Sequence, residues 1–138
     1  QGMSANKTRD FSSGNTTLIS ESTRIVGDLH FTGNLEIEGQ VTGNVLSSEG
    51  GDRVRVLPTG VVTGDIHSPM AVINGRVEGN IYSSEEVHLV ANSYVEGNLY
   101  YVLIEIEKGA QINGTFVYQP NPDDIKVLEN DDIATSNE

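Results

Sequence analysis

The chain has 138 residues, which suits one domain, and its 36% hydrophobic content with only 6% aromatic residues favours a thin core lined by aliphatic side chains. Its formal net charge of −12 repels nucleic-acid phosphates and anionic lipid surfaces, so we expect no nucleic-acid partner. The absence of cysteine excludes disulfides, cysteine–zinc sites and thiol catalysis.

Residues 1–16, "QGMSANKTRDFSSGNT", are polar and show no periodicity, so we predict a disordered N-terminal tail. The first three letters resemble the remnant of a protease site before a methionine. We therefore expect that a natural N-terminal membrane anchor, if the protein has one, precedes this sequence. No apolar run approaches the roughly 20 residues that a membrane-spanning helix needs.

Residues 17–118 contain a short motif that recurs six times: an apolar residue, any residue, glycine, a small polar residue and a second apolar residue. The copies are "IVGDL", "VTGNV", "VTGDI", "VEGNI", "VEGNL" and "INGTF". Successive repeat glycines are separated by 16, 21, 15, 18 and 17 residues. Such fixed-period self-similarity is typical of stacked-repeat architectures. The repeat glycines are Gly27, Gly43, Gly64, Gly79, Gly97 and Gly114.

Within each repeat, apolar and other residues alternate with a period of two, which predicts short strands. A repeat of about 17 residues is too short for a propeller blade and fits one coil of a parallel β-helix with three strands and three corners. Six coils at the inter-strand distance would form a rod roughly 29 Å long. We predict that one inward column of the core contains Ile25, Val41, Val62, Val77, Val95 and Ile112.

The glycine pattern also bears on the hand of the helix. Gly27, Gly33 and Gly39 are six residues apart, which is the spacing of hexapeptide left-handed helices. Elsewhere we interpret the glycine as recurring once per coil. The interpretation that we favour is therefore an all-β, right-handed parallel β-helix of about six coils.

Both ends of such a rod expose unpaired backbone groups above a slice of apolar core, and exposed strand edges pair with other chains unless they are blocked. The first coil begins with "TTLIS" and the last ends with "INGTFVYQ", and no helix is predicted beside either. We predict that the ends stack on one another, with Phe116 as the main C-terminal anchor. The predicted polymer contacts are Leu18, Ile19, Ile112, Phe116 and Tyr118.

Residues 119–138, "QPNPDDIKVLENDDIATSNE", begin with two prolines and carry six acids against one lysine. This composition cannot bury enough apolar area to offset the entropy of ordering, so we predict a disordered acidic C-terminal tail. The alternative is a short helix around residues 125–128 that forms on a partner.

The repeats resemble the bactofilin domain over about 100 residues. The resemblance rests on "GDLHFTGNLEIEGQVTGNV", "VRVLPTGVVTGDI", "VINGRVEGNIYSSEEVHLVANSYVEGNL" and "IEIEKGAQINGTF", in that order. It implies a right-handed β-helix that assembles end to end into non-polar filaments without a nucleotide. It also implies a cytoskeletal scaffold in the bacterial cytoplasm, often at the inner membrane, that organises cell-wall or cell-shape proteins.

The histidines are candidate metal ligands, and the acids are candidate catalytic carboxylates. His30 and His67 fall in one column but two coils apart, about 10 Å, which a single metal ion cannot bridge. His88 falls on another side. The pairs Glu36 with Glu38 and Glu105 with Glu107 alternate on outer faces, as a glycosidase pair could. Basic groups are few, so we predict no catalytic residue, no metal site and no cofactor.

Two classes of function remain open from the residues alone. The first is a structural polymer. The second is a non-polymerising β-helix that acts as a binding module or as a carbohydrate-active enzyme. Filaments formed without added nucleotide would support the first class, and a strict monomer with a defined ligand would support the second.

Overall fold

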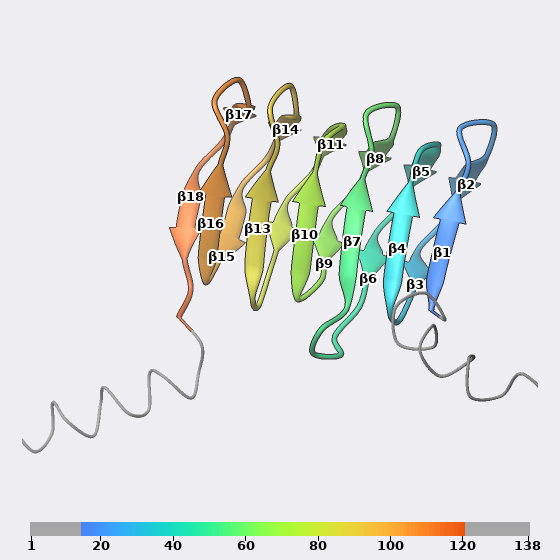
Figure 1. Ribbon diagram of the computed structural model, residues 1–138, viewed down its shortest axis with the longest axis horizontal. Helices are drawn as coiled ribbons and strands as arrows, with labels where there is room; N and C mark the ends of the chain where they lie inside the picture. Colours follow the sequence, from blue (N-terminus) through green and yellow to red (C-terminus); the bar gives the residue numbers. More distant parts are fainter. Residues whose placement is uncertain (1–14, 121–138) are drawn as a thin grey trace, which may run out of the picture.

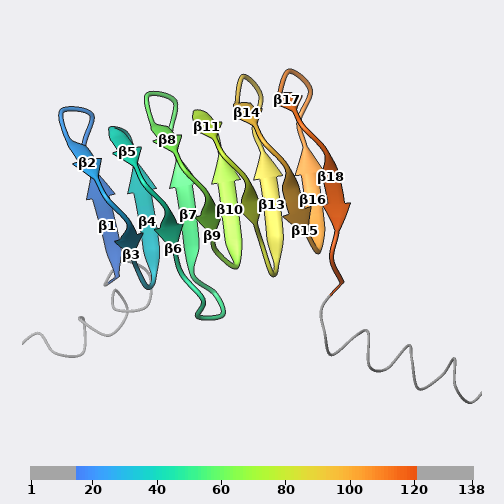
Figure 2. The same cartoon turned by 180° about the vertical axis from the view of Figure 1, so that it is seen from behind.

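The computed structural model describes residues 15–120. In this range the chain winds through six coils, and each coil contributes three short strands (Figure 1). The first and last coils lie at opposite ends of the rod in both views (Figures 1 and 2). Within the same range we find no helix long and apolar enough to cross a lipid bilayer.

The strands form three parallel sheets that run along the rod. Sheet A contains β1 (Thr16–Ile19), β4 (Asn34–Ile37), β7 (Arg53–Val56), β10 (Met70–Ile73), β13 (Glu86–Leu89) and β16 (Leu103–Ile106). Sheet B contains β2 (Arg24–Val26), β5 (Gln40–Thr42), β8 (Val61–Thr63), β11 (Arg76–Glu78), β14 (Tyr94–Glu96) and β17 (Gln111–Asn113). Sheet C contains β3 (Leu29–His30), β6 (Val45–Leu46), β9 (Ile66–His67), β12 (Ile81–Tyr82), β15 (Leu99–Tyr101) and β18 (Phe116–Tyr118).

Each strand pairs in register with the equivalent strand of the next coil. In β7, for example, Val54 and Val56 are fully buried, whereas Arg53 and Arg55 face outward. This alternation is the reason that such short segments form strands, because one face of each packs into the shared core. The prediction of a parallel β-helix of about six coils is therefore confirmed.

The predicted core column is continuous through sheet B. The register pairs Ile25, Val41, Val62, Val77, Val95 and Ile112 in succession. The four inner members are at most 1% exposed, whereas Ile25 and Ile112 in the outer coils are half-buried. The column thus runs the length of the rod and is open at both ends.

The residue after each repeat glycine forms a ladder of hydrogen bonds from coil to coil. The backbone N–H of Asn44 donates to Asp28 Oδ1 at 3.0 Å, and that of Asp65 donates to Asn44 Oδ1 at 2.9 Å. The same bond joins Asn80 to Asp65 and Asn98 to Asn80. Small polar side chains recur at this corner because each one satisfies a backbone donor that the turn leaves without a strand partner.

A second small-residue column lies at the corner before sheet B, and our interpretation of one glycine per coil is wrong there. This corner contains Gly39, Gly60 and Gly75 in three successive coils. A Cβ atom at any of these three would lie 2.2 Å from a backbone oxygen of the preceding coil. The remaining coils place Thr23, Ser93 and Ala110 at this position.

The structure also bears on the domain boundaries. Thr16, which we assigned to the N-terminal tail, is the first residue of β1 and pairs with Asn34. The last described strand, β18, ends at Tyr118. Residues 1–14 and 121–138 lie outside the described residues, so the predicted character of the two tails stays a prediction.

Candidate assembly ends of the rod

The C-terminal end presents three strands, β16, β17 and β18, that are paired on one side only. Phe116 stacks on Leu99 in an inward column, yet Phe116 is 43% exposed whereas Leu99 is fully buried. Ile106 is 46% exposed above the buried Leu89. These side chains point into the core and are accessible because no further coil covers them within residues 15–120.

The N-terminal end is the open edge of β1, β2 and β3. Its inward positions include Ile25 and Leu29, which are both half-buried. Val26 on the outer side of β2 is 72% exposed, the largest value among the exposed large hydrophobic residues. Each end therefore combines unpaired backbone groups with apolar side chains, as stacking of another β-sheet edge requires.

The five predicted contacts are not equivalent in the structure. Ile112, Phe116 and Tyr118 lie on the last strands of sheets B and C, and Tyr118 is 60% exposed. Ile19 is only 5% exposed, so it offers little contact area. Leu18 is 53% exposed but belongs to the outward column of Glu36, so it lies at the rim of the end.

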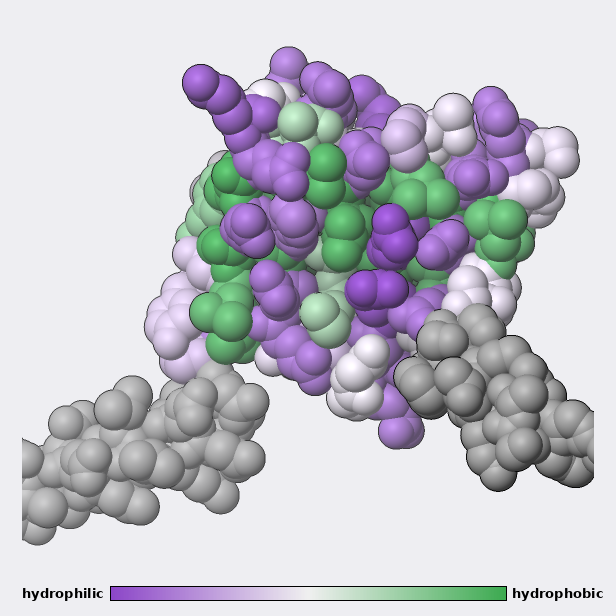
Figure 3. Space-filling view, in the orientation of Figure 1, coloured by the Kyte–Doolittle hydropathy of each residue, from purple (hydrophilic) through white to green (hydrophobic). Residues whose placement is uncertain are grey.

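Sequence reasoning missed several exposed apolar residues at the two ends. They are Val26, Leu103 and Ile106. The period of two places Ile106 on the same face as Ile104, so its position in the last coil could have marked it as an end contact. Val26 and Leu103 occupy outward positions, and the pattern of one strand does not show that they border an end. Figure 3 shows hydrophobic residues at both ends of the rod.

Two of the histidines take part in ring stacking and hydrogen bonding. His30 and His67 flank Leu46 in one outward column, two coils apart as predicted. The ring of His67 stacks on Tyr82 with centroids 4.3 Å apart, and Tyr82 stacks on Tyr100 at 4.6 Å. Among the residues that the structure describes, no group of three or more His, Asp or Glu side chains is placed to hold a metal ion.

The acids on the outer face of sheet A have partners of their own. His88 Nε2 lies 2.8 Å from Glu107 Oε2, and the backbone N–H of Ala91 donates to Glu107 Oε1 at 3.1 Å. The hydrogen bond from Ala91 and the one from His88 hold the pKa of Glu107 below its ordinary value. Glu36 lies 3.4 Å from Arg55 Nη1. Glu36 is therefore the ion-pair partner of Arg55, and Glu107 is the hydrogen-bond partner of His88.

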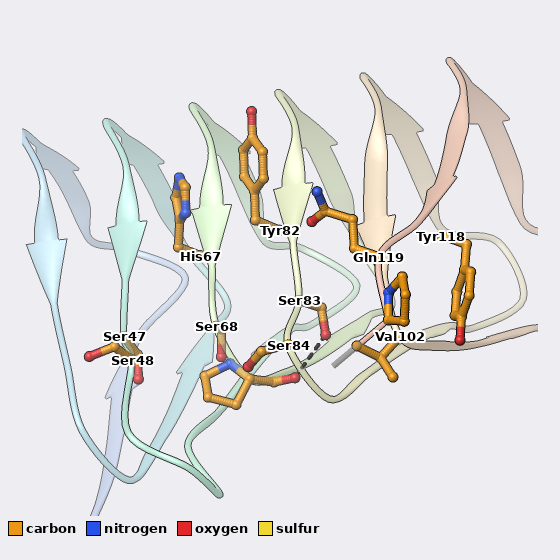
Figure 4. A pocket seen from close by; sticks show the side chains of 12 residues that line it. Ser47, Ser48, His67, Ser68, Tyr82, Ser83, Ser84, Val102, Tyr118 and Gln119 are labelled. Carbon is orange, nitrogen blue, oxygen red and sulfur yellow. Dashed lines mark hydrogen bonds between the residues drawn. The ribbon is translucent and has the colours of Figure 1, made fainter. Parts of the chain in front are cut away.

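A groove of about 680 Å³ follows the corner between sheets C and A, and the last described residues lie along it. It is lined by His67, Tyr82, Pro69 and Ser84 along the rod and by Pro120. Figure 4 shows the rings of His67 and Tyr82 side by side, with the serines at the opposite edge. Ser83 Oγ donates to the Pro69 carbonyl at 2.8 Å, so hydroxyl groups of this edge serve the turns between coils.

The family model of the bactofilins, described as polymer-forming cytoskeletal, matches residues 17–117. The chain belongs to the bactofilin family. The chain is 35% identical over 98 residues to bactofilin BacO of Myxococcus xanthus, which covers 71% of this chain and 75% of BacO.

A solved bactofilin structure shares the fold. It is the cryo-EM reconstruction of Thermus thermophilus bactofilin double helical filaments, with a TM-score of 0.63 and 26% identity. The match covers 75% of this chain and 99% of the Thermus chain. The bactofilin family is cytoskeletal and structural, which favours the polymer over the binding module or enzyme that the residues alone left open.

Proposed function

We propose that this bactofilin forms filaments by end-to-end stacking of its β-helix, without a nucleotide, and that the filaments are a scaffold in the bacterial cytoplasm. The observation that carries the proposal is the state of the inward columns in the last coil. Phe116 is 43% exposed although every residue below it in the column, from Val45 to Leu99, is fully buried. A second rod on this end would bury Phe116 as a further coil does.

Two contributions to the free energy of assembly favour the stacked state. Burying a large apolar side chain contributes roughly 1.5–3 kcal/mol, and several such side chains lie at each end. Pairing two open sheet edges also satisfies backbone N–H and C=O groups that otherwise bind only water. Neither contribution requires nucleotide hydrolysis, so assembly needs no cofactor.

We further propose that the filaments organise cell-wall or cell-shape proteins and lie at the inner face of the cytoplasmic membrane. The support is the resemblance to the family. Membrane attachment would use a segment outside residues 15–120, because the outer faces of the described rod carry many acids. Co-sedimentation of the filaments with vesicles of bacterial lipids tests this attachment.

Phe116→Arg tests the stacking itself. The new charge would lie within each C-terminal junction, where burying it without a partner is unfavourable, so elongation should stop while the rod stays folded. Thr63→Arg is the control, because it adds the same charge at an exposed, outward position of sheet B in an inner coil. Circular dichroism reports folding, and sedimentation with electron microscopy reports assembly. A folded Phe116→Arg protein that still pellets as filaments would refute the contact.

The size of the arrested Phe116→Arg species gives a second result. If like ends meet, as in the non-polar filaments that the family resemblance implies, the variant keeps its N-terminal junction and should form dimers. If unlike ends meet, every junction contains Phe116 and the variant should be monomeric. Analytical ultracentrifugation separates these two arrangements, and we expect dimers.

A further inference from the structure

A basic depression lies on the outer face of sheet A, away from both ends of the rod. Its volume is about 440 Å³, and it spans β7, β10 and β13. Arg53, Arg55 and His88 contribute its charged and titratable groups. The rest of its lining is largely apolar and comes from Val56, Leu57, Val72, Asn74 and Val90. No acidic side chain lines it, although the chain carries a net charge of −12.

The two arginines have hydrogen-bonding capacity left over. Arg53 Nε is buried and has no hydrogen-bond partner within residues 15–120. Arg55 makes a long contact of 3.4 Å to Glu36 with one nitrogen. His88 is held by Glu107 at 2.8 Å. Guanidinium groups bind carboxylates well, so an acidic ligand with an apolar centre fits this depression.

We propose that the acidic segment of the same chain, residues 121–138, folds back and occupies this depression. The place where the described chain ends supports this occupant. Pro120 lines the groove that Pro69 and Ser84 also line, and these two residues lie just before β10 and β13. The segment therefore leaves the rod at the edge where two of the three strands beneath the depression begin.

The composition of the segment matches the depression. Asp123 and Asp124 precede Ile125, Val127 and Leu128, which are apolar apart from Lys126 between them, and Glu129, Asp131 and Asp132 follow. Its acids would meet Arg53 and Arg55, and its apolar side chains would cover the Val72 side of the floor. Eighteen residues follow Pro120 and can span up to roughly 60 Å when extended, so the segment reaches the depression with length to spare.

This contact would make the segment an intramolecular ligand of Arg53 and Arg55, the only cluster of two arginines on the described outer faces. Because the segment is attached to the rod, its effective concentration at the depression exceeds that of free acidic peptides. An acidic partner protein, or the acidic segment of a second copy, would have to displace it. The inference does not require that the rods form filaments.

The absence of cysteine allows a direct cross-linking test in the full chain. The test variant carries Asn74→Cys in the depression and Val127→Cys in the segment. The control carries Thr63→Cys, an exposed position on sheet B, with the same Val127→Cys. We expect a bismaleimide reagent to join the two cysteines within one chain at least about fivefold faster in the test variant than in the control.

Charge changes in both partners probe the same contact. Arg53→Glu with Arg55→Glu should lower the rate of the test variant to that of the control, whereas Arg76→Glu on sheet B should not. Asp123→Asn with Asp124→Asn should also lower the cross-linking rate of the test variant, without altering any residue of the rod. High salt should act in the same direction, because it screens exposed charges.

Equal cross-linking rates at positions 74 and 63 would overturn the proposal, and so would a rate unaffected by the arginine and aspartate changes. Products formed only between chains would show that a second copy's segment occupies the depression and would also overturn it. Pelleting of the untreated proteins is measured separately. Failure of filament assembly would therefore leave the cross-linking result intact.

Discussion

The repeat glycines are required by backbone contact between coils. A Cβ atom at Gly97 would lie 2.0 Å from the carbonyl oxygen of Gly79, and the same short approach recurs at Gly43, Gly64 and Gly79. Gly97 also has φ +153, a conformation that other residues rarely adopt. Gly27 has φ +125 but belongs to the first coil, and nothing lies within 4 Å of its Cβ position.

This difference between coils predicts a matched pair of substitutions. Gly27→Ala should cost about 1 kcal/mol from backbone strain alone. Gly97→Ala should cost several kcal/mol more, because the backbone of the preceding coil cannot yield without breaking the ladder. Thermal or denaturant unfolding of the two variants measures the difference. Equal losses would show that the clash between coils is relieved at little cost.

At the scale of elements, the segment between β6 and β7 is longer than the equivalent connections in the other coils. It is anchored by Asp52, which is 5% exposed. Asp52 Oδ1 accepts a hydrogen bond of 2.7 Å from the backbone N–H of Gly33, and Oδ2 accepts one from Ser47 Oγ. The carboxylate thus ties the loop to the preceding coil and satisfies a backbone donor there.

We expect Asp52→Ala to destabilise the rod by about 1–3 kcal/mol, because the Gly33 N–H would lose its partner in a poorly hydrated position. Glu49→Ala in the same loop is the control and should change stability by no more than about 0.5 kcal/mol. Urea unfolding of both variants provides the comparison. If the two variants were equally stable, the loop would not depend on its buried carboxylate.

At the scale of the whole molecule, the rod of residues 15–120 contains the six described coils and should fold without the flanking segments. Deletion should remove residues 1–14 and 121–138 and keep Thr16 and Gln119. Thr16 pairs with β4, and the Gln119 N–H donates to the Tyr101 carbonyl at 2.7 Å. We expect the truncated protein to retain its β-rich circular dichroism.

The truncated protein should also associate laterally more than the full chain does. Deletion of the C-terminal segment removes six acids and one lysine, so electrostatic repulsion between filaments falls. Loss of the segment would also uncover the Arg53 and Arg55 depression. Filament widths in electron micrographs measure the effect. Loss of β structure on truncation would contradict the assignment of residues 15–120 as a self-sufficient rod.

Much of the fold could be predicted from the residues. The repeat period, the three strands per coil and the Val77 and Val95 column followed from alternation and glycine spacing. Both signals are local, because neighbouring residues on a strand must face opposite sides. The same rule shows that Leu18 and Ile19 could not both face inward. The alternating pattern of the first coil is too short to show which of Leu18 and Ile19 faces inward.

Contacts between coils could be decided only by the tertiary structure. The bond of Asp52 to Gly33, the close approach of Gly60 to Ile37 and the depression that Arg55 and His88 both line each involve residues at least fifteen positions apart. Which residues meet depends on the register of the stacked coils, and one longer connection shifts every later residue. The exposure of Phe116 has the same origin. Its column places it inward, and it is accessible because the described stack of coils stops there.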